Sequence, residues 1–342
     1  MTLANQQISD FFKNKKILVT GGTGSIGERI VSTLLAYEPE TIVVFNRDDT
    51  KQYLMKQKYA NEKRLRFILG DVRDYPSVDF AVRGMDYVFH AAALKQVPVC
   101  EENPFEAMKT NNFGSENVIR ASILNKVKKV INISTDKAVN PSNTMGATKL
   151  ITEKLFKQAN YMAGNTETKF CSVRFGNVIG SRGSVFPVLM NQALTGKPLT
   201  ITDPDMTRFF MSIQEAANLT IKAACYSEGG ETFILKMESL RLADLSEAVR
   251  EYSLNNGLPA PAVQVIGIRP GEKLHEELLS EDELPNLVED DELYVVLPAS
   301  RRGNAYLHFQ PSVITFYRSD KAPMVTTQQL SAILSRYRED KN

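Results

Sequence analysis

A glycine-rich segment near the N-terminus is the first stretch with a clear chemical use. TGGTGSIG (20–27) follows the apolar run KILVT (16–20) and spaces three glycines three residues apart. In this pattern the first glycine allows a tight turn, the second lets the backbone approach a pyrophosphate, and the third lets the next helix pack closely. The N-terminus of that helix offers N–H groups to phosphate oxygens. A glycine loop can also simply turn the chain, but its place between strand and helix favours a dinucleotide site. The residues predicted to bind the cofactor here are Gly21, Thr23, Gly24, Ser25, Ile26 and Gly27.

A second chemical group follows the apolar run KVINIS (129–134). Asp136 and Lys137 are adjacent there, and a carboxyl beside an amine can transfer protons. The pair could equally form a local salt bridge at a strand end. Lys149 lies four residues after Met145, so both should share one face of the following helix. The motifs around this segment decide between a salt bridge and a catalytic pair.

Short apolar runs that could position these groups recur along the first half of the chain. They are rich in Val, Ile and Phe and mostly do not alternate with polar residues, as expected of strands buried on both faces. Strands alternating with helix-length segments predict a parallel sheet with helices on both sides. Right-handed crossovers make this a doubly wound α/β fold of the Rossmann type. The predicted strands are 16–20, 41–45, 66–69, 86–90, 129–134 and 170–174; the predicted helices are 25–37, 104–125 and 144–163.

The pattern changes after about residue 176, where loops and short elements predominate. Two capped helices and one strand that returns to the sheet are predicted beyond this point. The helices are 212–224, with a capping box from Ser212 to Glu215, and 242–254, capped from Asp244 and Glu247; the strand is 231–236.

These elements suggest a large domain and a smaller, discontinuous one. The chain of 342 residues is long for a single dinucleotide-binding domain. The predicted division is 1–176 plus 207–236 for the cofactor, 177–206 plus 237–299 for the substrate, and 300–342 as a C-terminal extension, helical at its end, whose role the sequence does not assign.

Composition narrows the class of protein. Hydrophobic residues make up 43% and charged residues 24%, as in ordinary globular proteins. The net charge of +1 does not suggest a nucleic-acid partner. Three cysteines at irregular spacing predict no disulfide framework and fit a reduced, cytoplasmic setting. Three scattered histidines give no metal site, and no apolar run is long enough for a membrane helix.

The tip of the second predicted strand bears on the choice of cofactor. NAD enzymes usually place an acidic residue there for the ribose 2′-hydroxyl. FNRDDTK (45–51) instead offers Arg47, with Lys51 one turn later. Arg47 suits a 2′-phosphate and favours NADP, although it could also be a solvated surface charge beside Asp48. Asp71, followed by Val72, is expected at the adenine edge, and Ala91 and Ala92 allow the backbone to approach the cofactor.

Several motifs together carry a family resemblance over roughly residues 15 to 300. The sequence resembles the extended short-chain dehydrogenases/reductases, and more narrowly the UDP-N-acetylglucosamine 4,6-dehydratases that invert C5 in bacterial glycan synthesis. Similar enzymes keep their NADP tightly bound, recycle it at each turnover and form homo-oligomers, often hexamers. The motifs are TGGTGSIG, GDVRD, HAAALKQVP, ISTDKA, GATK, RFGNVIGSRGSV and TDPDMTRFF.

The resemblance assigns roles around the fifth predicted strand. It implies that Thr135 ends this strand at the site and that Lys149 holds the nicotinamide ribose. Such enzymes usually place a tyrosine four residues before this lysine, to take the proton of the sugar hydroxyl. This chain has Met145 there, whose thioether cannot usefully accept that proton. Asp136 could replace the tyrosine, directly or through water.

The resemblance also implies a reaction. The sugar is oxidised at C4, water leaves across C5–C6, C6 is reduced, and a proton returns to C5 on the opposite face. Asp136 would protonate the departing C6 hydroxyl. Lys137 would take the C5 proton, provided that a crowded cationic site lowers its pKa.

Loop residues after the sixth strand are expected to hold the nucleotide sugar. A diphosphate favours arginine and lysine partners, and an acidic residue suits a ribose hydroxyl. Any single arginine could instead form a surface salt bridge. The predicted substrate residues are Lys95, Asn177, Arg182, Thr202, Met206, Arg208, Arg269 and Glu272.

Three functions remain open from the sequence. The first is the complete UDP-N-acetylglucosamine 4,6-dehydratase with C5 epimerisation. The second is an enzyme that runs part of this reaction on an already dehydrated or 4-keto UDP-sugar, because the tyrosine is missing. The third is a non-catalytic subunit that binds nucleotide sugars, against which the retention of Thr135, Asp136, Lys137 and Lys149 argues.

Overall fold

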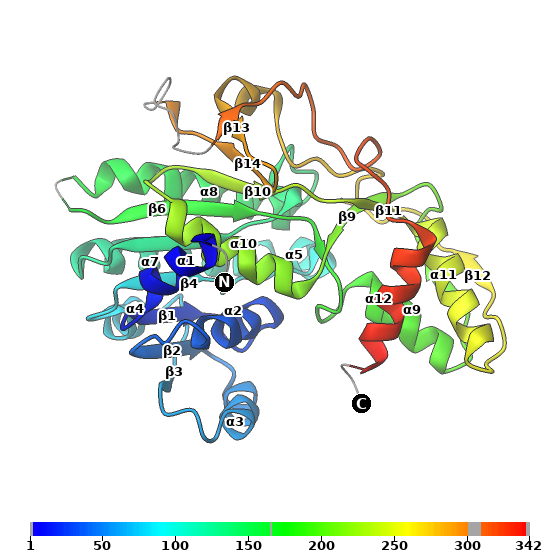
Figure 1. Cartoon of the computed structure of the whole chain (residues 1–342), viewed down its shortest axis with the longest axis horizontal. Coiled ribbons are helices and arrows are strands. Elements are labelled where there is room, and N and C mark those ends of the chain that lie inside the picture. The colour runs from blue at the N-terminus through cyan, green and yellow to red at the C-terminus, as the bar shows by residue number, and fades with distance from the viewer. Residues whose placement is uncertain (1–2, 165, 300–308, 340–342) are drawn as a thin grey trace.

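The computed structural model describes residues 3–164, 166–299 and 309–339. Within these residues, the large sheet has ten strands in the order β15-β13-β14-β10-β6-β5-β4-β1-β2-β3 (Figure 1). The seven strands from β10 to β3 are mutually parallel. The predicted doubly wound α/β fold is confirmed. These seven strands are β1 (Lys16–Thr20), β2 (Thr41–Asn46), β3 (Leu65–Leu69), β4 (Tyr87–His90), β5 (Lys129–Ile133), β6 (Lys169–Arg174) and β10 (Thr232–Leu235).

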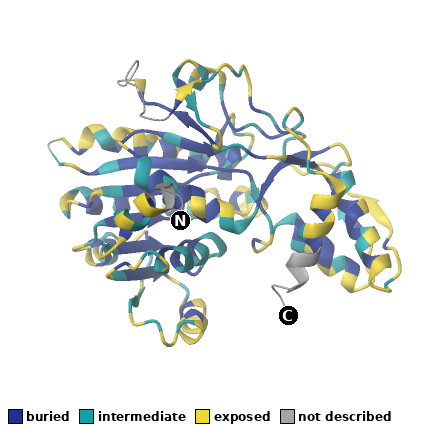
Figure 2. Cartoon of the chain, in the orientation of Figure 1, coloured by how far each residue is buried: buried dark blue, intermediate teal, exposed yellow. Residues whose placement is uncertain are grey.

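Helices cover both faces of the sheet because its central strands are apolar on both sides. In β1, Ile17 and Val19 belong to one core and Leu18 to the other. Figure 2 shows the buried strands between partly exposed helices. The first core takes in α1 (Leu3–Phe12), α2 (Ser25–Leu35) and α10 (Ile213–Tyr226); the second takes in α4 (Tyr75–Val82), α7 (Gly114–Leu124) and α8 (Thr144–Met162); α3 (Asp49–Lys58) packs beside β3.

Two helix predictions need correction. The predicted helix 104–125 is divided into α6 (Pro104–Met108), a π-helical turn (Lys109–Phe113) and α7. α11 (Leu242–Asn255) has Arg241 at its N-cap, without a side-chain cap. Asp244 instead pairs with Arg241 at 2.8 Å, so the predicted cap from Asp244 is wrong. The capping box from Ser212 to Glu215 is confirmed on α10.

A smaller part lies beside the sheet, at the right of Figure 1. Its core joins α9 and α11 to the C-terminal helix α12 through buried residues such as Leu189, Leu245 and Leu330. The C-terminal helix thus completes this core. The elements are β7 (Asn177–Val178), α9 (Val185–Leu194), β8 (Leu199–Ile201), β9 (Thr207–Met211), β11 (Ser239–Arg241), β12 (Val263–Val265) and α12 (Thr327–Glu339).

The edge of the large sheet departs from the predicted division of the chain. β13 (Leu287–Glu289) and β14 (Leu293–Val296) were assigned to the smaller domain, but they extend the large sheet beyond β10. β15 (Gln310–Pro311) adds to the same edge. From there residues 312–326 cross to α12, as the orange-to-red trace in Figure 1 shows. We call residues 309–326 the C-terminal strap. The division of function between the two parts stays a prediction.

Candidate active site

The candidate site is one cavity of about 620 Å³ at the carboxyl ends of the parallel strands. It runs from the glycine loop after β1, past the ends of β4 and β5, to the loops of the smaller part. β1 and β4 are neighbours in the sheet, and the chain order reverses between them. Ligands of open α/β sheets bind at this switch point.

The glycine loop packs so closely on neighbouring backbone that Gly21 and Gly27 cannot carry a side chain. A Cβ at Gly21 would lie 2.7 Å from the backbone nitrogen of Ala92, and one at Gly27 would lie 2.4 Å from the carbonyl oxygen of Gly21. Gly24 is the N-cap of α2 and provides no side-chain cap. The helix N-terminus therefore faces the cavity with donors for an anion.

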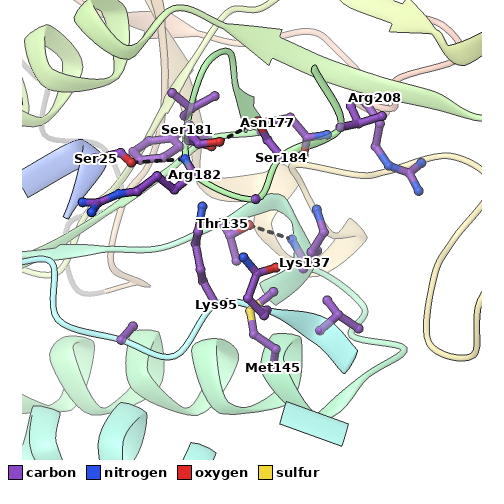
Figure 3. Close-up of a pocket in the computed structure, with 18 of the residues that line it drawn as sticks. Ser25, Lys95, Thr135, Lys137, Met145, Asn177, Ser181, Arg182, Ser184 and Arg208 are labelled. Carbon is purple, nitrogen blue, oxygen red and sulfur yellow. Dashed lines mark hydrogen bonds between the residues drawn. The ribbon is translucent and has the colours of Figure 1, made fainter. Parts of the chain in front are cut away.

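Arg182 lies against this glycine loop. Its Nη2 donates to the carbonyl oxygen of Thr23 at 2.6 Å, and its backbone N–H donates to Ser25 Oγ at 3.3 Å (Figure 3). The sequence placed Arg182 on the substrate. The structure places it where it joins the loop after β7 to the predicted cofactor loop.

The predicted adenosine end is an exposed charged cluster. Arg47 Nη1 is 3.5 Å from Asp71, which also receives Arg73 at 2.6 Å, and Lys51 pairs with Asp48 at 2.6 Å. Partial burial raises the pKa of Asp71, but its bonds to Arg73 outweigh this and leave the pKa below the ordinary value. Thr23, Arg47, Asp71 and Ala92 do not line the cavity, and the predicted cofactor residues that do line it are Gly21, Gly24, Ser25, Ile26, Gly27, Lys51, Ala91 and Lys149. Val72 does not line it; its side chain packs in the sheet core.

Lys149 is buried on α8 and donates from Nζ to the carbonyl oxygen of Ile133, at the end of β5. Burial lowers its pKa to about 8, with a smaller opposing effect of Glu153. Lys149 thus lines the cavity beside the end of β5, and its role toward the ribose stays a prediction. His90 lies nearby, between Thr20 at 2.8 Å and Ser115 at 2.9 Å. Burial lowers the pKa of His90 to about 3 and keeps it neutral.

β5 ends at Ile133, two residues before Thr135, which is the N-cap of a short 3-10 turn (Asp136–Ala138). Asp136 Oδ1 accepts from Thr135 Oγ1 at 2.7 Å and pairs with Lys137 Nζ at 3.0 Å. Lys137 Nζ is also 3.4 Å from Glu276 Oε1. Burial lowers the pKa of Lys137, but the two carboxylates outweigh burial and raise it. The prediction that a crowded cationic site lowers the pKa of Lys137 is therefore wrong.

Met145 takes the helix position expected for tyrosine. It is 3% exposed and packs with Cys100 and Ala107, while it also lines the cavity. α8 starts very close to the preceding turn: a Cβ at Gly146 would lie 2.1 Å from the carbonyl oxygen of Lys137. Because Gly146 has no side chain, α8 can lie directly against the turn that carries Lys137.

The predicted substrate residues all line the same cavity. Burial lowers the pKa of Lys95, and its neighbours Arg182 and Lys137 add to this. Figure 3 shows Lys95 extending toward the loop that carries Arg182. Arg208 is largely engaged by the protein, since it donates to the carbonyl oxygens of Thr207, Leu274 and Lys273. The cavity brings together Lys95, Asn177, Arg182, Thr202, Met206, Arg208, Arg269 and Glu272.

Glu276 is the main cavity residue that sequence reasoning missed. It is 2% exposed and lies between Lys137 and Arg208, whose Nε is 3.7 Å from Glu276 Oε1. Its only signal in the sequence was its place in GIRPGEKLHEE, four residues after Glu272.

Comparison with known proteins places this site in a family. The model of the family described as "Polysaccharide biosynthesis protein" matches residues 17–298. The chain belongs to this family. Its members among the relatives include proteins with named activities. Over 290 residues the chain is 44% identical to a UDP-N-acetylglucosamine 4,6-dehydratase (inverting) of Campylobacter jejuni, with 84% of each protein covered. It is 43% identical to a UDP-glucose 4-epimerase of Rickettsia canadensis, with 87% of each covered.

One further relative is more similar in sequence but carries a less explicit name. A protein of Methanocaldococcus jannaschii, named an uncharacterized membrane protein, is 51% identical, over 87% of this chain and 90% of its own. In the described parts of the present chain, no helix combines the length and the apolar character needed to span a bilayer. The X-ray structure of Pen from Bacillus thuringiensis superimposes with a TM-score of 0.89 at 41% identity, over 95% of this chain and 98% of that one. The chain is an extended short-chain dehydrogenase/reductase similar to the 4,6-dehydratases, as the motifs indicated.

Proposed function

We propose that this protein is a UDP-N-acetylglucosamine 4,6-dehydratase that inverts C5 and releases a UDP-4-keto-6-deoxy-HexNAc for surface or flagellar glycan synthesis. The observation that supports this most is Lys137 in the wall of one continuous cavity that also takes in the glycine loop, with the fully buried Asp136 paired to it at 3.0 Å. Oxidation and reduction alone need no such pair, whereas the loss of water across C5–C6 needs proton transfer at both carbons. The 44% identity to an inverting dehydratase supports the same substrate.

NADP is the cofactor that we propose, tightly bound and recycled. The glycine loop lines the cavity through Gly21, Gly24 and Gly27 and opens directly into the N-terminus of α2, which fits a dinucleotide. Gly24 to Gly27 and the start of α2 would hold the pyrophosphate, Lys149 the nicotinamide ribose, and Arg47 with Lys51 the 2′-phosphate. When bound, the nicotinamide supplies a reversible two-electron oxidation of the sugar.

The chain's own residues would then move the protons. Asp136 does not line the cavity itself, so it would take the proton of the C4 hydroxyl through Thr135, whose hydroxyl lines the cavity and donates to Asp136 Oδ1 at 2.7 Å. The same path would return that proton to the C6 hydroxyl as it departs as water. Lys137 in its neutral form removes the proton at C5, water supplies a proton to the opposite face of C5, and Lys137 then releases its proton to solvent. Met145 excludes water beside C4 and transfers no proton. Arg182, Arg208 and Arg269 supply positive charge for the diphosphate.

The direct test is a reaction of the purified protein with UDP-N-acetylglucosamine and NADP in heavy water, read by NMR and mass spectrometry. Loss of one water with deuterium at an inverted C5 supports the proposal. Asp136→Asn should then lower turnover by about 100-fold, the lower range for a general acid or base. Normal turnover of that variant would remove Asp136 from the mechanism.

Met145 favours one second candidate, an enzyme that runs only the later steps. Such an enzyme would leave UDP-N-acetylglucosamine untouched but convert an already dehydrated or 4-keto UDP-sugar. Supplying both substrates separates the two functions. We also propose a homo-oligomer, a hexamer by the family resemblance, working in the cytoplasm. Light scattering of the purified protein tests the assembly.

A further inference from the structure

Lys137 is enclosed by charged groups from three other parts of the chain. Asp136 approaches from its own turn, Glu276 from the segment before β13, and Arg208 from β9. Lys95, on the loop after β4, is a further cation close enough to affect it. The two carboxylates and the two nearer cations form a neutral cluster, so removing one carboxylate would leave an excess of buried positive charge.

Both carboxylates of this cluster have an oxygen without a partner. Asp136 is fully buried and Glu276 is 2% exposed, and neither Asp136 Oδ2 nor Glu276 Oε2 has a hydrogen-bond partner. A buried acceptor without a donor is costly. Because Glu276 lines the cavity, a donor in a bound ligand could satisfy its free oxygen. Sugar hydroxyls are such donors.

The C-terminal strap fixes the position of Glu276. The backbone N–H of Glu276 donates to Ser319 Oγ at 2.9 Å, and its carbonyl oxygen accepts from the backbone N–H of Ser319 at 2.9 Å. Ser319 is fully buried and also contacts Thr207 Oγ1 at 2.7 Å. Leu278 donates to the carbonyl oxygen of Tyr317, which extends the same contact. Glu276 is therefore held in place by an element distant in sequence.

We propose that Glu276 is a further member of the reacting cluster, where it holds Lys137 over the cavity and accepts a hydroxyl of the sugar at its free oxygen Oε2. This rests on the proposed function for the identity of the sugar. The raised pKa of Lys137 agrees with the geometry, since Glu276 and Asp136 both stabilise its charged form. Glu276 thereby sets the pH range over which Lys137 carries its proton.

The test compares Glu276→Gln with Glu277→Gln. The first change keeps the shape of the side chain and removes its charge. The second alters the neighbouring carboxylate, which binds Asn140 at 2.9 Å and does not line the cavity. Binding of UDP-N-acetylglucosamine and of UDP, which has no sugar hydroxyls beyond the uridine, is measured by calorimetry. Glu276→Gln should weaken the binding of UDP-N-acetylglucosamine by about tenfold or more, as expected for the loss of a hydrogen bond to a charged group. The binding of UDP should hardly change.

A second readout follows Lys137 itself. In protein with ¹³C-labelled lysine, the signal of Lys137 is assigned by its loss in Lys137→Arg and titrated with pH. Glu276→Gln should lower the pKa of Lys137, and Ser319→Ala should lower it less. Whether Lys137 must be charged or neutral, the limb of the pH–rate profile that it controls moves to lower pH.

The outcomes separate the two proposals. If the wild-type protein binds UDP-N-acetylglucosamine no better than UDP and does not convert it, the proposed function fails. If the wild-type protein binds and converts it, but Glu276→Gln leaves both the affinity ratio and the Lys137 titration unchanged, Glu276 has no such role. Thermal unfolding of both glutamine variants shows whether a loss of binding comes from misfolding.

Discussion

The guanidinium of Arg182 donates to the carbonyl oxygen of Thr23 at 2.6 Å and so joins the loop after β7 to the glycine loop. Arg182→Ala removes this contact and should weaken dinucleotide binding by about tenfold, since a hydrogen bond from a charged donor is worth about 1.5–3 kcal/mol. Fluorescence titration with NADPH measures it. Arg83→Ala, which removes an exposed arginine paired with Asp79, should have no effect. If Arg182→Ala and Arg83→Ala bind NADPH equally well, Arg182 contributes to substrate binding only.

Gly27 should tolerate no larger residue. In Gly27→Ala the new Cβ would lie 2.4 Å from the carbonyl oxygen of Gly21, so the loop or α2 must shift. We expect a loss of about 1–3 kcal/mol in stability, as for other overpacked sites, and no measurable cofactor binding. Gly84→Ala is the control, because its Cβ would meet nothing within 4 Å although its φ is +72°. It should lower the melting temperature slightly and leave binding intact.

The choice between NADP and NAD can be tested at Arg47. Its side chain is 52% exposed and pairs weakly, at 3.5 Å, with Asp71. If Arg47 binds the 2′-phosphate, Arg47→Ala should lower the affinity for NADP about tenfold and that for NAD hardly at all. A parallel loss for both cofactors would show a role in the loop rather than at the phosphate, and a wild-type preference for NAD would refute the assignment.

Lys149 predicts a pH dependence of stability. Burial lowers its folded-state pKa to about 8, below the ordinary 10.5. Burying the charged form therefore opposes folding below about pH 8, and this penalty fades as the pH rises from about 8 toward 10.5. At about 1.4 kcal/mol per pKa unit, the penalty is on the order of 3 kcal/mol. Lys149→Met should therefore be more stable than the wild type at pH 7, and urea unfolding across this range should show the difference shrinking. A constant difference would contradict the lowered pKa.

Met145 should be replaceable by another apolar residue of its size. Met145→Leu keeps the packing against Cys100 and Ala107 and adds no proton acceptor. Because the proposed mechanism uses Asp136 in place of tyrosine, turnover should stay within about threefold of the wild type, as expected of a swap that conserves volume. A 100-fold loss of turnover would instead indicate that the sulfur of Met145 takes a direct part in the reaction.

Local signals in the sequence were sufficient for the parallel strands, the glycine loop and the capping box at Ser212. They failed where a distant segment decides the outcome. The pKa of Lys137 is raised by Asp136, its neighbour in the sequence, and further by Glu276, which nothing near Lys137 in the sequence announces. The cap of α11 was misplaced because the helix starts directly after β11, before Asp244. Val72 was expected at the cofactor but packs in the core beside Gly114.

The C-terminal strap supports the candidate site from outside the segment that the family model matches. The family model ends at residue 298, yet Ser319 holds Glu276 by two hydrogen bonds, and α12 completes the core around α11. Two relatives could thus share every motif and still differ in the pKa of the lysine equivalent to Lys137, because their C-terminal segments differ. Chimaeras between such relatives should exchange residues 309–339 together with the loop that carries Glu276.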